Sequence, residues 1–353
     1  MDLRAQFPVL ERMAYLNAGT DGPVPAAAVR AAREELDAEL TDGRVRPHFE
    51  RRFELHDELR AGYARVLGCA VEDLAITTST SDGIGRVLAG LDLGPDDEIL
   101  TSDQEHPGLV GPLIAARLRG ATVRAVPMRE LADAVGPATT LVACSHVNWI
   151  TGETAPAELA QVDVPVVYDG AQGVGAVPID LAALGCDAYA ASGQKWMCGA
   201  DGTGMLYLAP EFRARVRMIA PGYLSFEDPA RGLESTLREE AQAWGAPISR
   251  EAAAFSLGAL RVLEAAGWDA VHARSAGLAA ELAERLEAAG RRVVPRAATT
   301  LVSFDDPDPA ETRVRLAEAG VAIRDLPGTA LLRASVGAWN DESDFQRLID
   351  GLR

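Results

Sequence analysis

The chain has 353 residues, of which 48% are hydrophobic and 24% charged, the balance of a globular protein long enough for two domains. Its formal net charge of −18 argues against a nucleic-acid partner and against an acidic membrane surface, because both require a basic face. No uncharged apolar run could span a bilayer, MDLRAQFPVLERM lacks the apolar core of a signal peptide, and the four cysteines form no C-x-x-C pair. We therefore expect a cytoplasmic protein without a disulfide framework or a zinc site.

The first predicted element is a helix over residues 49 to 67. Its apolar residues recur at three- and four-residue steps, which is the spacing of one face of an α-helix. They are Phe49, Phe53, His56, Leu59, Tyr63, Val66 and Leu67. His56 lies on this stripe, so we interpret it as a core histidine and not as a ligand.

From about residue 74 the pattern changes to short apolar runs that end in small or polar residues and are separated by helix-length segments. The runs are LAITTST, EILTSD, LVACSHV, PVVYDGA, AYAAS and GMLYL. This alternation predicts an α/β fold with a mostly parallel sheet covered by helices on both faces. In such sheets ligands bind beyond the carboxyl ends of the strands, so the residues that end each run are the site candidates.

The C-terminal part of the chain predicts a second, smaller unit. A helical tract from about residue 250 to 289 precedes the segments RRVVPRAATTLVSFDD, PAETRVRLAEAG, VAIRDL, ALLRASVGAW and DESDFQRLIDGLR. We expect an N-terminal segment at 1–14, a large domain at 15–250 and a small α+β domain at 251–353. A cleft between the two domains would suit a small substrate.

The first strand end with chemical potential lies in LAITTSTSDGIGRVLAGL, which predicts a strand, a turn and a helix. Thr80, Ser81 and Asp82 lie around the start of the helix. Free amides and the positive end of the helix dipole can bind a phosphate there, with the two hydroxyls as extra donors. Capping of the helix by Ser81 or Asp82 explains the same residues without a ligand.

Two further strand ends provide a carboxylate and an imidazole. Asp169 ends a buried run, and Gln172 follows it. A carboxylate at that depth needs a cation such as a protonated pyridine nitrogen, or the amide hydrogens of the next turn. His106 follows the run EILTSD, where its ring could stack on a flat ligand or be exposed in a loop.

A lysine follows another strand end, within ASGQKWMCGADGTG. Among apolar groups and near other cations, Lys195 would lose part of its preference for the charged form and become a nucleophile towards an aldehyde. The alternative is a surface lysine, which the neighbours Ser192, Gln194 and Trp196 disfavour. A phosphate turn, a ring-stacking histidine, a buried aspartate and this lysine together indicate pyridoxal phosphate (PLP).

The sequence resembles the class V aminotransferase superfamily of fold type I PLP enzymes over nearly its whole length. The resemblance is carried by YLNAGTDGPVP, TSTSDGI, DQEHPG, SHVNWITGE, VYDGAQGVGAVPIDLAALGCDAYAASGQKWMCGADGTGMLY and IRDLPGTALLRASVGAWND. It implies a large domain with a seven-stranded, mostly parallel sheet, a small C-terminal α+β domain, and a homodimer with sites at the subunit boundary.

The resemblance also implies a role for each strand-end residue. Lys195 would form the Schiff base with PLP, His106 would stack on the ring, and Asp169 would pair with the pyridine nitrogen. Gln172 would contact the ring hydroxyl, and Arg333 would bind the α-carboxylate of an amino-acid substrate. The phosphate would be surrounded by Thr80, Ser81, Ser192 and Gln194.

Other positions concern the surroundings of the cofactor. Asn148 and Trp149 lie in the segment that is beside the ring in the family. Gln194 stands where many relatives have histidine, so the phosphate would gain a neutral donor in place of a potential cation. Ala246 occupies the place of a threonine that relatives lend to the phosphate of the neighbouring subunit, with Ser249 close in sequence.

The reaction follows from what the small domain lacks. Desulfurases of the superfamily use a cysteine just ahead of the arginine that Arg333 matches, and no cysteine follows Cys198 here. The short connection from Arg324 to Arg333 and the motifs EHPG and GQKWMCG resemble instead the cysteine/cystine carbon–sulfur lyases. We expect β-elimination from cysteine, cystine or a cysteine conjugate, with Lys195 as the base at Cα and aminoacrylate released to give pyruvate and ammonia. We interpret Cys198 as a small buried residue.

Other activities would use the same cofactor residues. A class V aminotransferase, a cysteine desulfurase or an epimerase of the isopenicillin N type would differ in the substrate pocket. Outside catalysis, the alternative is a protein that only senses or stores PLP.

Overall fold

The computed structural model describes residues 2–353, and its larger part is built on a seven-stranded sheet with the order β2-β8-β7-β6-β5-β3-β4. The strands are Leu74–Thr77 (β2), Glu98–Ser102 (β3), Thr122–Val126 (β4), Thr139–Ser145 (β5), Val166–Asp169 (β6), Ala188–Ser192 (β7) and Gly204–Leu208 (β8). Neighbours from β7 to β4 are parallel, whereas β8 is antiparallel to both β7 and β2. The predicted α/β fold with a mostly parallel sheet is confirmed.

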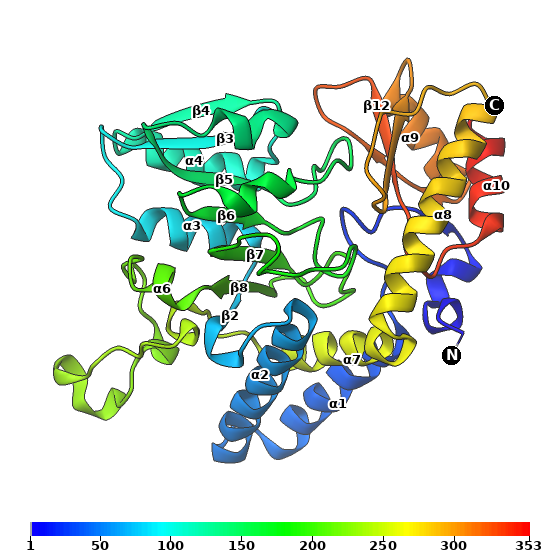
Figure 1. Cartoon of the computed structure of the whole chain (residues 1–353). Helices are drawn as coiled ribbons and strands as arrows, with labels where there is room; N and C mark the ends of the chain where they lie inside the picture. Colours follow the sequence, from blue (N-terminus) through cyan, green and yellow to red (C-terminus); the bar gives the residue numbers. More distant parts are fainter. Residues whose placement is uncertain (1) are drawn as a thin grey trace.

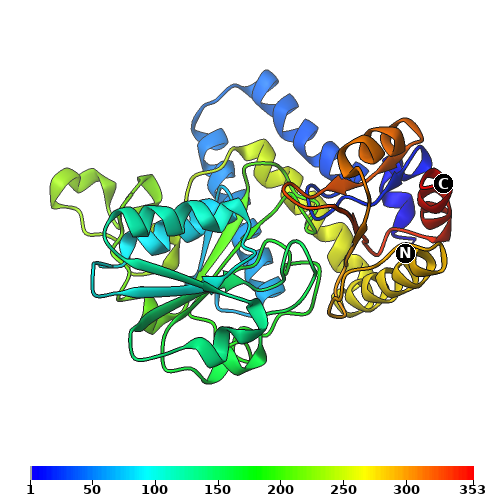
Figure 2. The same ribbon diagram turned by 90° about the horizontal axis from the view of Figure 1, so that it is seen from above.

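Helices cover both faces of this sheet (Figures 1 and 2). In β5, Val142 packs into the core that includes α2 (Arg46–Leu67). Its neighbour Leu141 points to the opposite face and packs into the core of α3 (Thr80–Gly90) and α4 (Pro107–Leu118). Because both faces are buried, the central strands are apolar along their length and are visible in the sequence as runs.

Strand β4 is the strand of this sheet that the apolar runs do not predict. It lies at the edge of the sheet, and all five of its residues are at least partly exposed. Arg124, in its centre, forms an ion pair with Glu98 of β3 at 2.8 Å. A short edge strand with a charged residue carries no buried run, so its position depends on tertiary pairing with β3.

The helix predicted over residues 49 to 67 is α2. His56 is buried on its inner face, at 3% exposure, as expected of a core histidine. Phe49, at the start of the predicted stripe, is 46% exposed instead and packs edge-on against Phe53, with ring centroids 4.8 Å apart. The apolar stripe therefore continues from the core onto the surface.

The C-terminal part forms the predicted smaller α+β unit around an antiparallel sheet with the order β11-β12-β9. Its elements are α7 (Arg250–Ala266), α8 (Trp268–Ala288), β9 (Leu301–Asp305), α9 (Pro309–Glu318), β10 (Val321–Ala322), β11 (Arg324–Asp325), β12 (Leu331–Ser335) and α10 (Glu342–Gly351). The predicted helical tract is divided at Gly267, whose φ of 83° ends α7 in a conformation that favours glycine.

The N-terminal chain is attached to this smaller unit. Strand β1 (Ala14–Tyr15) pairs in parallel with β10, and Figure 2 shows the two chain ends on that side of the molecule. Helix α1 (Ala26–Asp42) then packs against α7. The boundaries at 1–14, 15–250 and 251–353 stay a prediction.

Short helices fill the remaining connections. They are α5 (Leu131–Ala134), α6 (Pro210–Arg213) and the 3-10 turns Arg4–Gln6, Pro8–Glu11, Val71–Asp73, Met128–Glu130, Ala157–Gln161, Tyr223–Ser225, Pro229–Glu234 and Ala241–Trp244. Of the helices within residues 2–353, none has the length and apolar character needed to cross a membrane.

Candidate active site

The carboxyl ends of the central parallel strands carry two of the predicted cofactor residues, Asp169 and Ser192. Ser145 ends β5, Asp169 ends β6 and Ser192 ends β7. Ser145 is the register partner of Asp169, and Asp169 is that of Ala190 in β7. The ends of successive runs therefore meet along one edge, as the parallel topology predicts.

Lys195 lies in the turn after β7, where the N-terminal loop comes close. Gly22 of that loop donates its N–H to Gln194 O at 2.7 Å. A Cβ at Gly22 would lie 2.1 Å from Lys195 O, so only glycine allows this approach. Within residues 2–353 no hydrogen bond or ion pair holds the lysine amine, which leaves it available to a ligand.

The surroundings of Lys195 weaken its preference for the charged form. Burial lowers the pKa of this amine, and of the nearby charges Asp169 and Asp21 oppose the shift while Arg333 adds to it. A larger fraction of neutral amine is present at a given pH than for a lysine in water. Neutral amine is the form that attacks an aldehyde.

A tight turn with two close-packed glycines follows Asp169. Asp169 is 4% exposed, and its Oδ1 accepts a hydrogen bond from Ala171 N at 2.9 Å. Cβ atoms on Gly170 and Gly173 would lie 2.0 Å and 2.1 Å from atoms of the Tyr189 side chain. Only glycine therefore fits at these two positions of the turn. Burial raises the pKa of Asp169, although Lys195 and the amide of Ala171 oppose the shift.

The side chain of Gln172 joins two loops of the site. Its Nε2 donates to Gly19 O of the N-terminal loop at 2.8 Å, and its Oε1 accepts from Trp196 Nε1 at 3.0 Å. Trp196 follows the lysine directly, so Gln172 fixes the lysine turn against the loop that covers it. Its contact with the ring hydroxyl of PLP stays a prediction.

The start of α3 contains the predicted phosphate residues. Thr80 Oγ1 lies 2.7 Å from Ser192 Oγ, and Thr80 N donates to the same serine oxygen at 3.2 Å. The interpretation that Ser81 or Asp82 caps the helix is wrong, because the capping oxygen belongs to Ser79, which accepts from Asp82 N at 3.1 Å. Ser79 precedes the first helical residue, which is the geometry that capping requires. Ser81 is exposed, and its hydroxyl does not cap the helix.

His106 lies at the start of α4, next to the start of α3. Its Nδ1 accepts a hydrogen bond from Gly108 N at 3.0 Å, which makes it the cap of the helix. A Cβ on Gly108 would lie 2.6 Å from Ser81 Oγ, so the two helix starts touch. The imidazole meets Trp149 edge-on, with centroids 5.0 Å apart and planes at 88°. This histidine is partly buried, which excludes the freely exposed loop position.

His106 is neutral at physiological pH. Burial lowers its pKa to about 4, and the positive charges of Lys195, Arg333 and Arg324 add to the shift. A neutral, fixed imidazole can stack on an aromatic ring without adding positive charge to the site.

Arg333 is buried on β12 with no acidic partner in the described chain. It is 2% exposed, its NH1 donates to Trp149 O at 2.7 Å, and its Nε has no hydrogen-bond partner there. Ser335 Oγ is similarly buried without a partner. A Cβ on Gly19 would lie 2.9 Å from Arg333 NH2 and 2.7 Å from Ser335 Oγ, so the glycine leaves a small space between them.

Arg324 is the residue of this region that sequence reasoning missed. It lies on β11 directly opposite Arg333, and like charges in that position destabilise a sheet. Its charge and burial together lower the pKa of Arg333 to about 9, with burial the larger cause. No spacing marks Arg324, because the pairing of two arginines becomes visible only when the strands are in register.

Asn148 and Gln194 differ in whether their side-chain oxygens are already hydrogen-bonded within residues 2–353. Asn148 Oδ1 accepts from Ile150 N at 2.8 Å and from Thr151 N at 3.0 Å, so it shapes the turn that carries Trp149. Gln194 Oε1 is buried without a partner among residues 2–353. Their contacts with PLP stay predictions.

Ala246 and Ser249, which lie near the expected subunit boundary, both form hydrogen bonds within their own chain. Ala246 N donates to Ile76 O at 2.8 Å, which extends the edge of β2. Ser249 Oγ accepts from Ala252 N at 3.3 Å and caps α7. The hydroxyl of Ser249 is therefore engaged within its own chain.

Cys198 is buried at 1% exposure, as interpreted from the sequence. Its φ of 53° is unusual for a residue other than glycine, and its thiol packs against the loop at Gly22. Burial raises the pKa of this thiol, so it is protonated at physiological pH. A protonated, enclosed thiol is a poor sulfur acceptor.

The residues present fit PLP. The free lysine amine, the buried oxygen of Gln194 and the hydroxyl pair of Thr80 and Ser192 lie around the same strand ends as Asp169. They provide a nucleophile, polar groups for a phosphate and an acid for a ring nitrogen, which are the functional groups of that cofactor.

Comparisons with known proteins agree with this arrangement. The family model described as "Aminotransferase class-V" matches residues 14–348. The structure of the cystine C–S lyase C-DES with its reaction product cysteine persulfide superposes with a TM-score of 0.92 and 28% identity, over 98% of this chain and 99% of that one. A C-DES variant with glycine covalently linked to the PLP cofactor gives the same TM-score at 27% identity, over 99% and 98% of the two chains.

A relative found by sequence is named for a different activity. Isopenicillin N epimerase of Streptomyces clavuligerus is 29% identical over 391 residues, covering 96% of this chain and 93% of its own. The expectations of a fold type I architecture and of a PLP-dependent enzyme are confirmed at the level of the family. The chain belongs to the class V aminotransferase family.

Proposed function

We propose that the chain is a PLP-dependent carbon–sulfur lyase that acts on cysteine, cystine or a cysteine conjugate by β-elimination. The observation that carries the proposal is the hairpin β11–β12, in which Arg324 faces Arg333 and the connection DLPGTALL contains no cysteine. Two arginines that form no ion pair within residues 2–353 suit a substrate with one or two carboxylates. The absent cysteine disfavours a desulfurase that passes sulfur to its own thiol. The overall likeness to the cystine lyase C-DES supports the same choice.

Each site residue has a proposed task. PLP, when bound, withdraws electrons from Cα of an attached amino acid. Lys195 would hold the cofactor, and its amine, freed when the amine of the substrate takes its place on the cofactor, would accept the Cα proton. Asp169 would keep a proton on the pyridine nitrogen. His106 would stack on the ring, and Arg333 would bind the α-carboxylate and so hold the substrate near Lys195.

The phosphate would be held between the starts of α3 and α4. Thr80, Ser81, Ser192 and Gln194 provide hydroxyl and amide groups there, and the α3 dipole adds a favourable field. Asn148 would shape the turn beside the ring, and Gln172 would meet the ring hydroxyl. These assignments follow the resemblance and the distances given above.

We also propose a cytoplasmic homodimer. Phe49, Phe53 and Tyr223 form an aromatic cluster in which Phe49 is 46% and Tyr223 55% exposed, with these two rings 6.0 Å apart. The cluster adjoins Ile248 in a surface cavity, two residues from Ala246. A second copy covering this cluster would remove the aromatic rings from water. Light scattering of the active enzyme should give twice the mass of one chain, and a fully active monomer would contradict the proposal.

One experiment addresses the cofactor and the reaction together. Borohydride reduction followed by mass spectrometry should find the pyridoxyl group on Lys195, and Lys195→Ala should abolish turnover. The wild-type enzyme, given a panel of sulfur amino acids, should release pyruvate from cystine or a related substrate. A modified lysine elsewhere in the chain, or no pyruvate from any member of the panel, would overturn the proposal.

The second candidate is an epimerase, favoured by the 29% identity over 96% of the chain with isopenicillin N epimerase. Inversion at Cα of an amino-acid substrate, without release of pyruvate, would identify it.

A further inference from the structure

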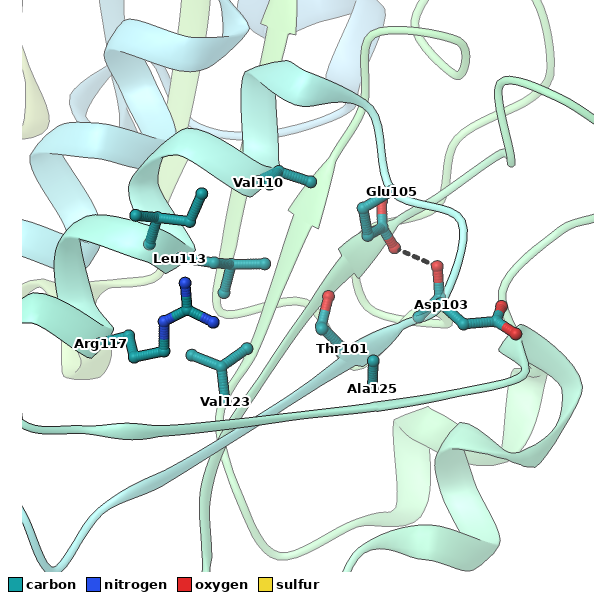
Figure 3. Close-up of a pocket in the computed structure, with 10 residues that line it drawn as sticks. Thr101, Asp103, Glu105, Val110, Leu113, Arg117, Val123 and Ala125 are labelled. Atoms are coloured by element: carbon teal, nitrogen blue, oxygen red, sulfur yellow. Dashed lines mark hydrogen bonds between the residues drawn. The ribbon is translucent and has the colours of Figure 1, made fainter. Parts of the chain in front are cut away.

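A buried carboxylate directly precedes the histidine at the start of α4. Glu105 is 9% exposed and lies in the turn between β3 and α4. Its Oε1 accepts from Ser102 Oγ at 2.6 Å and from Ser145 N at 3.0 Å, and its Oε2 accepts from Ser145 Oγ at 2.5 Å. None of these partners is a cation. Figure 3 shows Glu105 on the wall of a cavity between α4 and the sheet, on the far side from Arg117.

These hydrogen bonds tie the histidine turn to the row of strand ends. Ser102 ends β3 and Ser145 ends β5, and Ser145 is in register with Asp169. His106, the next residue, caps α4 with its own side chain, so the hydrogen bonds of Glu105 hold the residue directly before the cap.

A buried carboxylate is a costly way to close a turn. Burial raises the pKa of Glu105, the three hydrogen bonds oppose this shift, and the negative charge of Asp169 adds to it. Hydrogen bonds to a charged group offset part of the penalty, but an apolar side chain would avoid it altogether. What the carboxylate provides is a rigid, two-oxygen clamp between β3, β5 and α4.

We propose that Glu105 is a positioning residue that holds His106 over the PLP ring. The inference rests on the proposed binding of PLP at Lys195 and is independent of the reaction that follows. It concerns geometry and not charge. In a glutamine variant the amide oxygen can accept from Ser102 and from Ser145 N, and the amide nitrogen can donate to Ser145 Oγ after that hydroxyl rotates.

The test compares two substitutions by PLP affinity of the apoenzyme and by the visible circular dichroism of bound cofactor. Glu105→Ala should weaken PLP binding about three- to tenfold, the value of one lost aromatic stack, and reduce the dichroism. Glu105→Gln should restore both to within about twofold of wild type. Asp103→Ala is the matched control, because this exposed carboxylate belongs to the same turn and, among the described residues, its side chain has no hydrogen bond.

A double substitution separates positioning from general stability. If Glu105 acts through His106, then Glu105→Ala adds nothing to the loss caused by His106→Gln, whereas a purely structural defect adds to it. Additive losses, wild-type affinity of Glu105→Ala, or equal damage from alanine and glutamine would each overturn the inference. If the alanine variant does not fold, Ser145→Ala removes one of the three bonds and should give a smaller loss in the same two measurements. Failure of the proposed function would appear differently, as no PLP binding by the wild-type protein.

Discussion

The two sides of the site differ in how their polar groups are used. On the side of the large sheet, Asp169 and Gln172 and the pair of Thr80 and Ser192 are hydrogen-bonded within the chain. On the side of the small sheet, Arg333 Nε and Ser335 Oγ are buried without partners in the described chain. On the first side folding fixes the turns and leaves the Lys195 amine and Gln194 Oε1 unpaired among the site residues of the described chain, whereas on the second side the charged arginine itself lacks an acidic partner within residues 2–353.

This difference separates the two tasks of the site. Cofactor chemistry depends on fixed angles, which hydrogen-bonded turns provide. Substrate recognition gains most when a buried cation is left for the incoming carboxylate, because the desolvation penalty has already been met in folding. A bound carboxylate should therefore stabilise the protein as well as occupy the site.

On the side of the large sheet, we expect the largest loss of turnover from Asp169→Asn. The amide keeps the shape of the turn but cannot hold a proton on the pyridine nitrogen. We expect PLP to remain bound and turnover to fall by about a hundredfold or more, the scale of one lost electrostatic contact in an active site. Turnover and bound-cofactor absorbance should be measured on the same sample, with Asp163→Asn as an exposed control. Near-normal turnover would remove Asp169 from the mechanism.

The side of the small sheet is tested by substituting its two facing arginines, Arg333 and Arg324. Arg333→Gln should raise KM by about ten- to a hundredfold, the value of one or two charge-assisted hydrogen bonds, because it removes the proposed partner of the α-carboxylate. Arg324→Gln should have a smaller effect on cysteine than on cystine, whose second carboxylate lies farther from Cα. Steady-state kinetics with both substrates measures the contrast. Equal effects of the two substitutions on cysteine would mean that the facing arginines share one carboxylate.

The same contrast explains what the sequence could predict. The sheet side follows from local patterns, since apolar runs reveal buried strands and the residue after each run lies at the carboxyl-end edge. Lys195, Asp169 and His106 are brought to that edge as expected, while their roles towards PLP stay predictions. The arginine side depends on register between distant segments, so Arg324 and the opening at Gly19 carry no local signal. The sequence misplaced the cap because the five consecutive hydroxyl-bearing residues from Thr77 to Ser81, and Asp82 after them, can each cap a helix.

A third prediction concerns His146, a buried residue that directly follows β5. It is 6% exposed, its Nδ1 is 2.9 Å from Tyr189 Oη, and burial lowers its pKa to about 4. The unfolded chain, with an ordinary histidine pKa of about 6.5, binds more protons between these values, so the stability of the native state falls as pH drops from about 6.5 towards 4. The contribution is of order 1–2 kcal/mol after allowance for relaxation.

The substitution His146→Gln removes this titrating group. Denaturation of the apoenzyme at a series of pH values should show a shallower loss of stability below pH 6.5 than wild type. Because Glu105 and Asp169 have raised pKa values, their contribution has the opposite sign: it is present below their unfolded pKa values and is lost as pH rises through the folded ones. An unchanged slope in the variant would show that His146 does not titrate in this range.

The smallest expected effect concerns Cys198, which lies between the two sides, with its thiol against Gly22 of the N-terminal loop. If sulfur leaves the substrate without a protein carrier, Cys198→Ala should change stability and not turnover. Removal of the buried sulfur leaves a small cavity that costs about 1 kcal/mol, and alanine keeps the left-handed backbone as strained as before. Thermal unfolding and pyruvate release should be compared for the wild type, this variant and Cys144→Ala, a second buried thiol on β5. Loss of pyruvate release by Cys198→Ala alone, with cofactor absorbance intact, would mean that this thiol takes part in the elimination.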